Sequence, residues 1–142
     1  MSRIRSRRDD FHFFKPIEVR WGDMDSLGHV NNAQYFVYSE CARIAYFDEL
    51  FAGDESFLRE QGPILAAIAC DYHEQVHYPA QLEVGIGIRR MGNSSLELVC
   101  PIFHQGQDSA VADIRATIVW FDYVNQRSMP LPERMRGQPL LA

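Results

Sequence analysis

The sequence predicts an α+β domain in which a five-stranded antiparallel sheet curls around one long central helix. The stretch 32–51 contains no Gly or Pro, and its apolar residues cover more than one stripe, which is typical of a largely buried helix. Most of the chain after it alternates apolar and polar residues, as strands with one buried face do. A single buried helix and a single sheet can cover each other only if the sheet curls around the helix.

The elements are expected in the order strand, helix and four more strands. The first strand is predicted at 12–20, which the chain enters past Pro16, a residue that suits a strand start or an edge. The helix follows at 32–51, and Gly53 ends it. The stretch 64–76 is read as the second strand, although its many alanines mean that periodicity alone does not separate strand from helix.

The last three strands alternate cleanly and are joined by short turns, which predicts an antiparallel meander. Their apolar positions are Leu82, Val84, Ile86 and Ile88, then Leu96, Leu98, Cys100 and Ile102, then Ala112, Ile114, Ala116, Ile118 and Trp120. The tail after them is rich in proline and should lie irregularly across the surface. With no repeat or linker visible, residues 1–142 form a single predicted domain.

Length and composition limit what the chain can be. A chain of 142 residues with 46% hydrophobic content is large enough for one folded core. The formal net charge of -5 argues against nucleic acid as the main partner. No apolar run approaches the length that spans a membrane. The first ten residues are rich in arginine, and we interpret them as a flexible tail.

The three cysteines are Cys41, Cys70 and Cys100, and none forms a C-x-x-C pair. This usage favours a reducing compartment, and hence a cytoplasmic location, over a disulfide framework or a zinc site. His73 and His77 do not have a spacing that indicates metal ligands. No metal and no cofactor are therefore predicted.

The loop before the helix carries the strongest chemical signal. It reads G-D-M-D-S-L-G-H-V-N-N-A-Q-Y, in which Asn31 can cap the helix and Gln34 stands where a capping-box partner belongs. With Asn31 as the cap, the backbone N–H of Asn32 has no intrahelical acceptor and lies at the positive end of the helix dipole. A loop with carboxylates beside such an N–H suits attack on a carbonyl group.

This loop, followed by E-C-A-R, resembles the signature of the 4-hydroxybenzoyl-CoA thioesterase-like branch of the hotdog-fold acyl-CoA thioesterases. The later stretches G-N-S-S-L-E-L and P-L-P-E-R-M-R are also similar to that family. The resemblance implies the hotdog fold and hydrolysis of an acyl-CoA or acyl-carrier-protein thioester. It also implies a homodimer with its active sites at the subunit boundary, or a homotetramer made of two such dimers.

The resemblance places the catalytic carboxylate at Asp25 and the oxyanion donor at the backbone N–H of Asn32. A carboxylate beside a thioester can attack the carbonyl carbon or activate a water molecule, and the sequence leaves both routes open. Asp25 could instead serve only to form an Asx-turn in a tight loop. His29 is a second candidate acid or base, with a structural hydrogen-bonding role as its alternative.

Other polar residues near the motif have predicted supporting roles. Asp23 is expected to order the loop by bonding backbone N–H groups. Gly28 is expected to permit a backbone conformation, or a close approach of the substrate, that a side chain would block. Glu40 is a backup carboxylate, and it could pair with Arg43 three residues along the helix.

A hairpin turn between two predicted strands is a candidate site for the phosphates of CoA. Arg89, Arg90, Ser94 and Ser95 flank this turn, and two arginines beside hydroxyl groups could hold a phosphate. An ordinary solvated turn explains the same residues equally well.

Two other functions fit the same residues. Asp25 and His29 could be the acid and the histidine of a hotdog enoyl-thioester hydratase or dehydratase. A non-catalytic protein on the same fold could bind acyl thioesters without hydrolysing them. Release of a free thiol separates hydrolysis from both alternatives.

Overall fold

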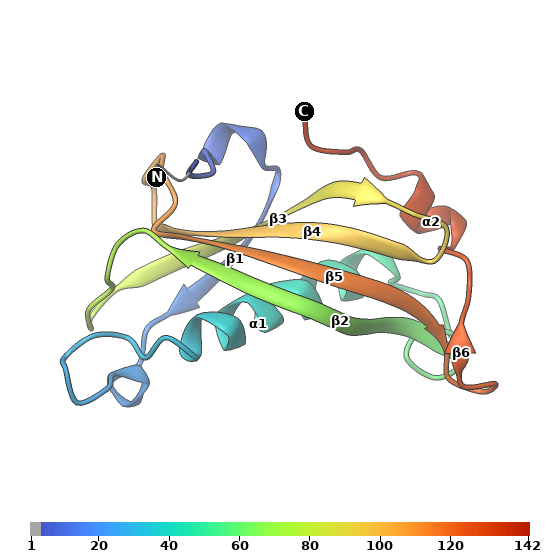
Figure 1. Cartoon of the computed structure of the whole chain (residues 1–142), viewed down its shortest axis with the longest axis horizontal. Helices are drawn as coiled ribbons and strands as arrows, with labels where there is room; N and C mark the ends of the chain where they lie inside the picture. The colour runs from blue at the N-terminus through green and yellow to red at the C-terminus, as the bar shows by residue number, and fades with distance from the viewer. Residues whose placement is uncertain (1–3) are drawn as a thin grey trace.

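The computed structural model describes residues 4–142 and contains one long helix and one curled sheet (Figure 1). The elements in chain order are η1 (Arg8–Asp10), β1 (Phe13–Glu18), η2 (Trp21–Asp23), α1 (Gln34–Leu50), β2 (Gln61–Tyr72), β3 (Gln81–Met91), β4 (Ser95–His104), β5 (Ala112–Asp122), β6 (Arg127–Ser128) and α2 (Glu133–Arg136). No helix among residues 4–142 is long and apolar enough to cross a membrane.

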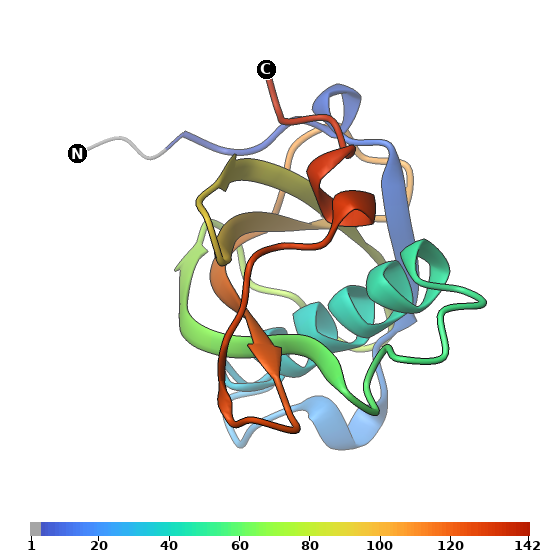
Figure 2. The same cartoon turned by 90° about the vertical axis from the view of Figure 1, so that its right-hand side faces the viewer.

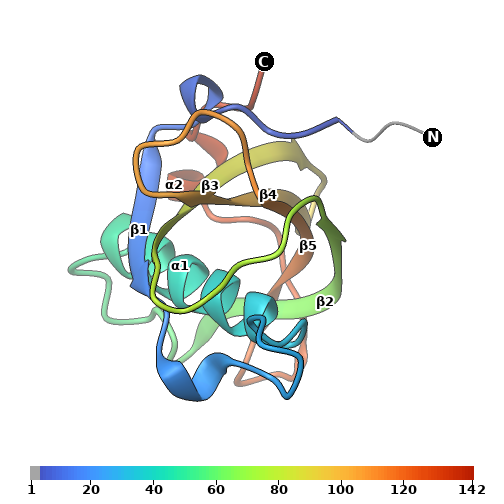
Figure 3. The same ribbon diagram turned by 90° about the vertical axis from the view of Figure 1, so that its left-hand side faces the viewer.

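The sheet is antiparallel throughout, with the strand order β1-β3-β4-β5-β2 and the two-residue strand β6 added to β5. Viewed from either end, it curls around α1, which lies in its concave face (Figures 2 and 3). The predicted α+β architecture of five strands around a central helix is confirmed. The second strand, which the sequence left ambiguous, is the long edge strand β2 beside β5.

The core lies between the helix and the concave face of the sheet. The alternating residues predicted for β3, β4 and β5 are all buried, and Trp120 is inaccessible to solvent. Its ring packs against Phe47 and Phe51 of the helix end and against Phe57. Its indole N–H donates to the side chain of Gln61, 2.9 Å away. Burying one large ring with its polar atom satisfied ties the end of α1 to β5 and β2.

The start of α1 differs from the prediction, because the helix begins at Gln34 rather than Asn32. The side-chain oxygen of Asn31 accepts a hydrogen bond from the N–H of Ala33 at 2.8 Å, but the N-cap position of α1 is Ala33, which makes no side-chain cap bond. The predicted return bond from the Gln34 side chain is absent from the described residues. The carbonyl of Asn32 instead accepts a hydrogen bond from the hydroxyl of Tyr72, and Phe36 N–H bonds to Ala33. The first turn is therefore not α-helical.

The flexible tail predicted for the first ten residues is not seen at residues 5–10, which contact the body of the domain. The Arg5 guanidinium lies 2.6 Å from the carboxylate of Glu74, and the Ser6 N–H donates to Asp113 at 2.9 Å. The prediction for residues 1–3 lies outside the described residues.

The C-terminal tail runs beside the edge of β3, beyond the point where β1 stops pairing with that strand. The N–H of Leu141 donates to the carbonyl of Ile88 at 2.7 Å, so the tail continues the sheet edge. Gly87 makes room for it, because a Cβ there would lie 2.6 Å from the Leu141 side chain. The sequence predicted an irregular tail, and the short helix α2 within it was missed.

Candidate active site

The loop that carries the predicted site is held from inside by Asp23. Its buried carboxylate accepts hydrogen bonds from the Tyr38 hydroxyl at 2.7 Å and from the backbone N–H and guanidinium of Arg20 at 3.0 Å each. Burial alone would raise the pKa of Asp23, but the bonds from Tyr38 and Arg20 outweigh it, so the pKa is lowered. An ionised carboxylate thus anchors the loop to α1, as predicted for Asp23.

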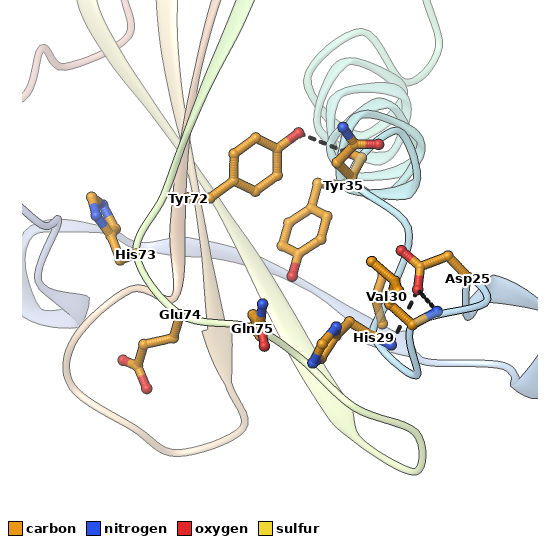
Figure 4. Close-up of a pocket in the computed structure, with 10 residues that line it drawn as sticks. Asp25, His29, Val30, Tyr35, Tyr72, His73, Glu74 and Gln75 are labelled. Carbon is orange, nitrogen blue, oxygen red and sulfur yellow. Dashed lines mark hydrogen bonds between the residues drawn. The ribbon is translucent and has the colours of Figure 1, made fainter.

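Asp25 presents one carboxylate oxygen to the loop and keeps the other free. Oδ1 accepts a hydrogen bond from the N–H of Leu27 at 2.9 Å and a longer one from His29 at 3.4 Å (Figure 4). Oδ2 has no hydrogen-bond partner in the part of the chain that the structure describes. The Asx-turn and the catalytic interpretation are therefore compatible, because they use different oxygens of the same carboxylate.

Gly28 shapes the loop through its backbone. Its φ of +83° lies in the left-handed region, which favours a glycine here, and no described atom lies within 4 Å of a Cβ built there. Its carbonyl lies 3.0 Å from Nδ1 of His77. Because a carbonyl only accepts, this nitrogen carries the proton. Gly28 lines a second cavity of about 460 Å³ on the outer side of the loop.

His29 lies against the ring of His77, with the two ring centroids 4.7 Å apart. The His29 ring makes no hydrogen bond with any described residue. Its imidazole lines the same cavity as Asp25 and is half-buried. Both roles considered for His29 remain compatible with this position.

Three N–H groups around the helix start have acceptors within the chain. Asn31 donates to the carbonyl of Asp23, Ala33 to the Asn31 side chain, and Gln34 to the Asn31 carbonyl, at 2.8–2.9 Å. Within residues 4–142, the N–H of Asn32 has no acceptor. It is therefore a donor at this helix start that a bound carbonyl oxygen can use.

These groups line one cavity of about 490 Å³ between the loop and the end of β2. Asp25 and His29 lie on one side, the stretch 72–75 lies on the other, and Tyr35 lies between them (Figure 4), while Asn32 also lines the cavity. The Tyr35 and Tyr72 rings meet edge to face at 5.0 Å. Sequence reasoning missed this second wall, since no local pattern indicates which residues, forty positions away, will face the loop.

A family model described as the thioesterase-like superfamily matches residues 19–138, which include the loop, the helix and the whole meander. The chain belongs to this superfamily. The PA5185 protein of Pseudomonas aeruginosa has a crystal structure that superposes with a TM-score of 0.85, at 32% identity over 94% of this chain and 92% of that one. This likeness agrees with the hotdog fold that the sequence motif implied.

Two further relatives are informative. A thioesterase from Thermus thermophilus, solved with coenzyme A and Zn, is 30% identical over 89% of this chain and 95% of that one, with a TM-score of 0.74. The YsmA protein of Bacillus subtilis strain 168 is 34% identical over 91 residues, which are 64% of this chain and 60% of YsmA. The match therefore spans less than two thirds of YsmA.

Within one chain of this thioesterase-like protein, the predicted phosphate-binding residues lie far from Asp25. The turn with Arg89, Arg90, Ser94 and Ser95 is at the α2 end of the sheet, opposite the loop (Figure 1). Arg89 lies 3.4 Å from the carboxylate of Glu97, and both arginines are exposed. Geometry within a single chain does not bring this turn to the cavity.

One other predicted arrangement is not formed. Arg43 is buried and donates to the hydroxyl of Ser39 at 2.8 Å instead of pairing with Glu40, which is exposed. The prediction of a Glu40–Arg43 pair is wrong, because Arg43 is buried and bonded to Ser39 while Glu40 remains exposed. His73 contacts Asp113 at 3.0 Å, and the described residues contain no group of three or more potential metal ligands.

Proposed function

We propose that this protein is a thioester hydrolase that cleaves an acyl-CoA or acyl-carrier-protein thioester into a free acid and a thiol. The observation that carries the proposal is the pairing of two unused groups on one cavity. One is the free Oδ2 of Asp25, and the other is the free N–H of Asn32. A carboxylate and an oxyanion donor are the two groups that attack on a thioester carbonyl requires.

The chemistry follows from these two positions. The N–H of Asn32 stabilises the negative charge that develops on the carbonyl oxygen as the carbonyl carbon becomes tetrahedral. Oδ2 of Asp25 either bonds to that carbon, forming a mixed anhydride that water hydrolyses to the free acid once the thiolate has left, or takes a proton from a water molecule that attacks the carbonyl carbon directly. In both routes, the tetrahedral intermediate collapses with cleavage of the C–S bond.

Coenzyme A as the thiol is supported by the Thermus relative, whose structure contains coenzyme A. In a homodimer, the turn of one chain can reach the phosphates of a substrate bound at the Asp25 loop of the partner. The groups that would contact the phosphates are Arg89, Arg90, Ser94 and Ser95. In this arrangement the turn and the loop belong to one site, although they lie far apart within a single chain.

The proposed assembly is a homodimer, or a homotetramer of two such dimers, in which two sheets join at β2. Strand β2 ends the sheet and pairs only with β5 among the described strands. It is 12 residues long and exposes Ile64 and Leu65, which are 38% and 44% accessible. Long apolar edges of this kind are rarely left bare in native proteins. Light scattering at micromolar concentration tests the assembly, and a monomeric mass would contradict it.

A panel of acyl-CoA and acyl-carrier-protein thioesters, assayed for thiol release with a disulfide reagent, tests the function. Hydrolysis of at least one thioester supports it, and the preferred substrates identify the acyl group and the carrier. A change in enoyl absorbance without thiol release would instead indicate a hydratase. Binding without any turnover would indicate a non-catalytic acyl-thioester binding protein.

A further inference from the structure

The carbonyl of Asn32 is bonded from outside the helix. In a regular helix it would accept from the N–H of Phe36, but that N–H bonds to Ala33 at 3.2 Å. The hydroxyl of Tyr72 donates to the Asn32 carbonyl at 2.7 Å instead. This single side-chain bond therefore fixes the peptide between Asn32 and Ala33. That peptide is next to the one that carries the free N–H of Asn32.

Tyr72 is itself held from several directions. It is the last residue of β2, in register with Ala112, and the N–H of the next residue, His73, donates to Val111 at 2.8 Å. The buried His73 side chain contacts the carboxylate of Asp113 at 3.0 Å. The Tyr72 ring also packs edge to face on Tyr35. Its hydroxyl is thus placed by the sheet rather than by a mobile loop.

The Tyr72 hydroxyl keeps its proton at neutral pH. Burial, with a smaller contribution from Cys70, raises the pKa of Tyr72 to about 12. The hydroxyl can therefore donate to the Asn32 carbonyl across the range in which an enzyme of this kind would act.

We propose that Tyr72 is a positioning residue for thioester hydrolysis. Its hydroxyl holds the Asn32 carbonyl out of the helix and so keeps the Asn32 N–H aimed at the cavity. The inference rests on the proposed function, because it assigns a role to Tyr72 in that same site. Without the hydroxyl, the Asn32 carbonyl is free to accept from Phe36, and the first helical turn can close. Because that change rotates the backbone about Asn32, the N–H of Asn32, which belongs to the preceding peptide, would turn away from the substrate carbonyl.

The chain offers a matched control at the other end of β2. The hydroxyl of Tyr123 donates to the carbonyl of Pro63 at 3.0 Å, which is the same type of bond far from the cavity. Tyr72→Phe should lower kcat about tenfold to a hundredfold and leave KM within about twofold, because misplacement of a catalytic group affects the chemical step. Tyr123→Phe should change neither constant. An unchanged kcat in Tyr72→Phe, a rise in KM alone, or an equal loss in Tyr123→Phe would overturn the proposal.

An NMR readout keeps this test separate from the function itself. Loss of the Tyr72 hydroxyl should shift the amide resonance of Ala33, whose N–H shares the peptide with the Asn32 carbonyl. Tyr123→Phe should shift the amide of Ile64 instead. If wild-type protein hydrolyses no thioester, the proposed function fails whatever these shifts are. If wild-type protein is active and Ala33 does not shift in Tyr72→Phe, the positioning role fails alone.

Discussion

The loop at 21–32 and the turn between β3 and β4 both display polar side chains beside a strand end, but only the loop is held from inside. The loop has the buried Asp23 carboxylate as its anchor and leaves the N–H of Asn32 and one carboxylate oxygen of Asp25 unused. The turn has exposed arginines, and its backbone carbonyl at Asn93 accepts hydrogen bonds from Leu131 and Arg136 of the C-terminal region. A buried anchor gives the loop a fixed geometry that the turn lacks within one chain.

The largest expected effect comes from removing the free carboxylate of the loop. Asp25→Asn keeps the size of the side chain but removes the nucleophile or base, so kcat for thioester hydrolysis should fall about a hundredfold or more. Steady-state assays with circular dichroism check the loss and the fold. The control is Asp48→Asn, an exposed carboxylate on α1 that should not matter. Turnover close to wild type in Asp25→Asn would contradict the assignment.

Removing the Asp23 carboxylate should leave the loop, like the turn, without a buried anchor. Asp23→Asn should lower the free energy of unfolding by about 2 kcal/mol at neutral pH, since charged hydrogen bonds to a buried carboxylate are lost. The pKa of folded Asp23 lies below its ordinary value of 3.8, so its stabilisation is complete above that pH and is lost as the pH falls through the lower folded value. Urea titrations below pH 3.8 should therefore show the wild type approaching the variant. A difference that stays constant across this range would contradict the pKa shift.

The turn should matter only for substrates with a nucleotide. Arg89→Ala combined with Arg90→Ala should raise KM for CoA esters about tenfold, by removing charge-assisted contacts to phosphate. KM for short thioesters that lack the nucleotide should not change. Equal effects on both substrates would assign these arginines to stability. Co-refolding this double variant with Asp25→Asn should restore one complete site in a mixed dimer, whereas no recovery would place each site within one chain.

The smallest effect concerns the backbone of the loop. Gly28→Ala should cost about 1 kcal/mol of stability, because φ of +83° is unfavourable for a residue with a Cβ. Gly22→Ala, in the same loop, has equal space and no positive φ, so it should cost nothing. Thermal unfolding of the two variants measures the difference. Equal stabilities would show that the loop adjusts its conformation freely.

The sequence predicts those parts of the molecule that depend on neighbours along the chain. The stretch 32–51 without Gly or Pro and the alternation of the last three strands reflect a helix and a sheet that cover each other, so the fold follows from them. The spacing of Asp25 and Asn32 likewise places two groups on one loop and helix start. The hydrogen bond from the Ala33 N–H to the Asn31 side chain follows for the same reason, although the helix starts later than predicted.

Contacts between distant segments set the features that the sequence did not predict. Tyr72 changes the start of α1 from forty positions away, and Asp113 orders the N-terminal segment through Ser6. The direction of Arg43 depends on what the curled sheet presents to its side of the helix. None of these contacts has a local signature, because each depends on which residues the finished sheet brings together.

Burial of Cys100 decides how cleanly turnover can be followed with a disulfide reagent. Burial raises the pKa of this thiol to about 12, even though the Arg43 guanidinium opposes the shift, and burial also raises the pKa of Cys70 to about 11. Thiols that stay protonated react slowly, because the thiolate is the nucleophile. Cys41, exposed on α1, is then the main source of background colour from the folded protein. A Cys41→Ser enzyme should give a nearly silent baseline against which slow thioester cleavage becomes measurable.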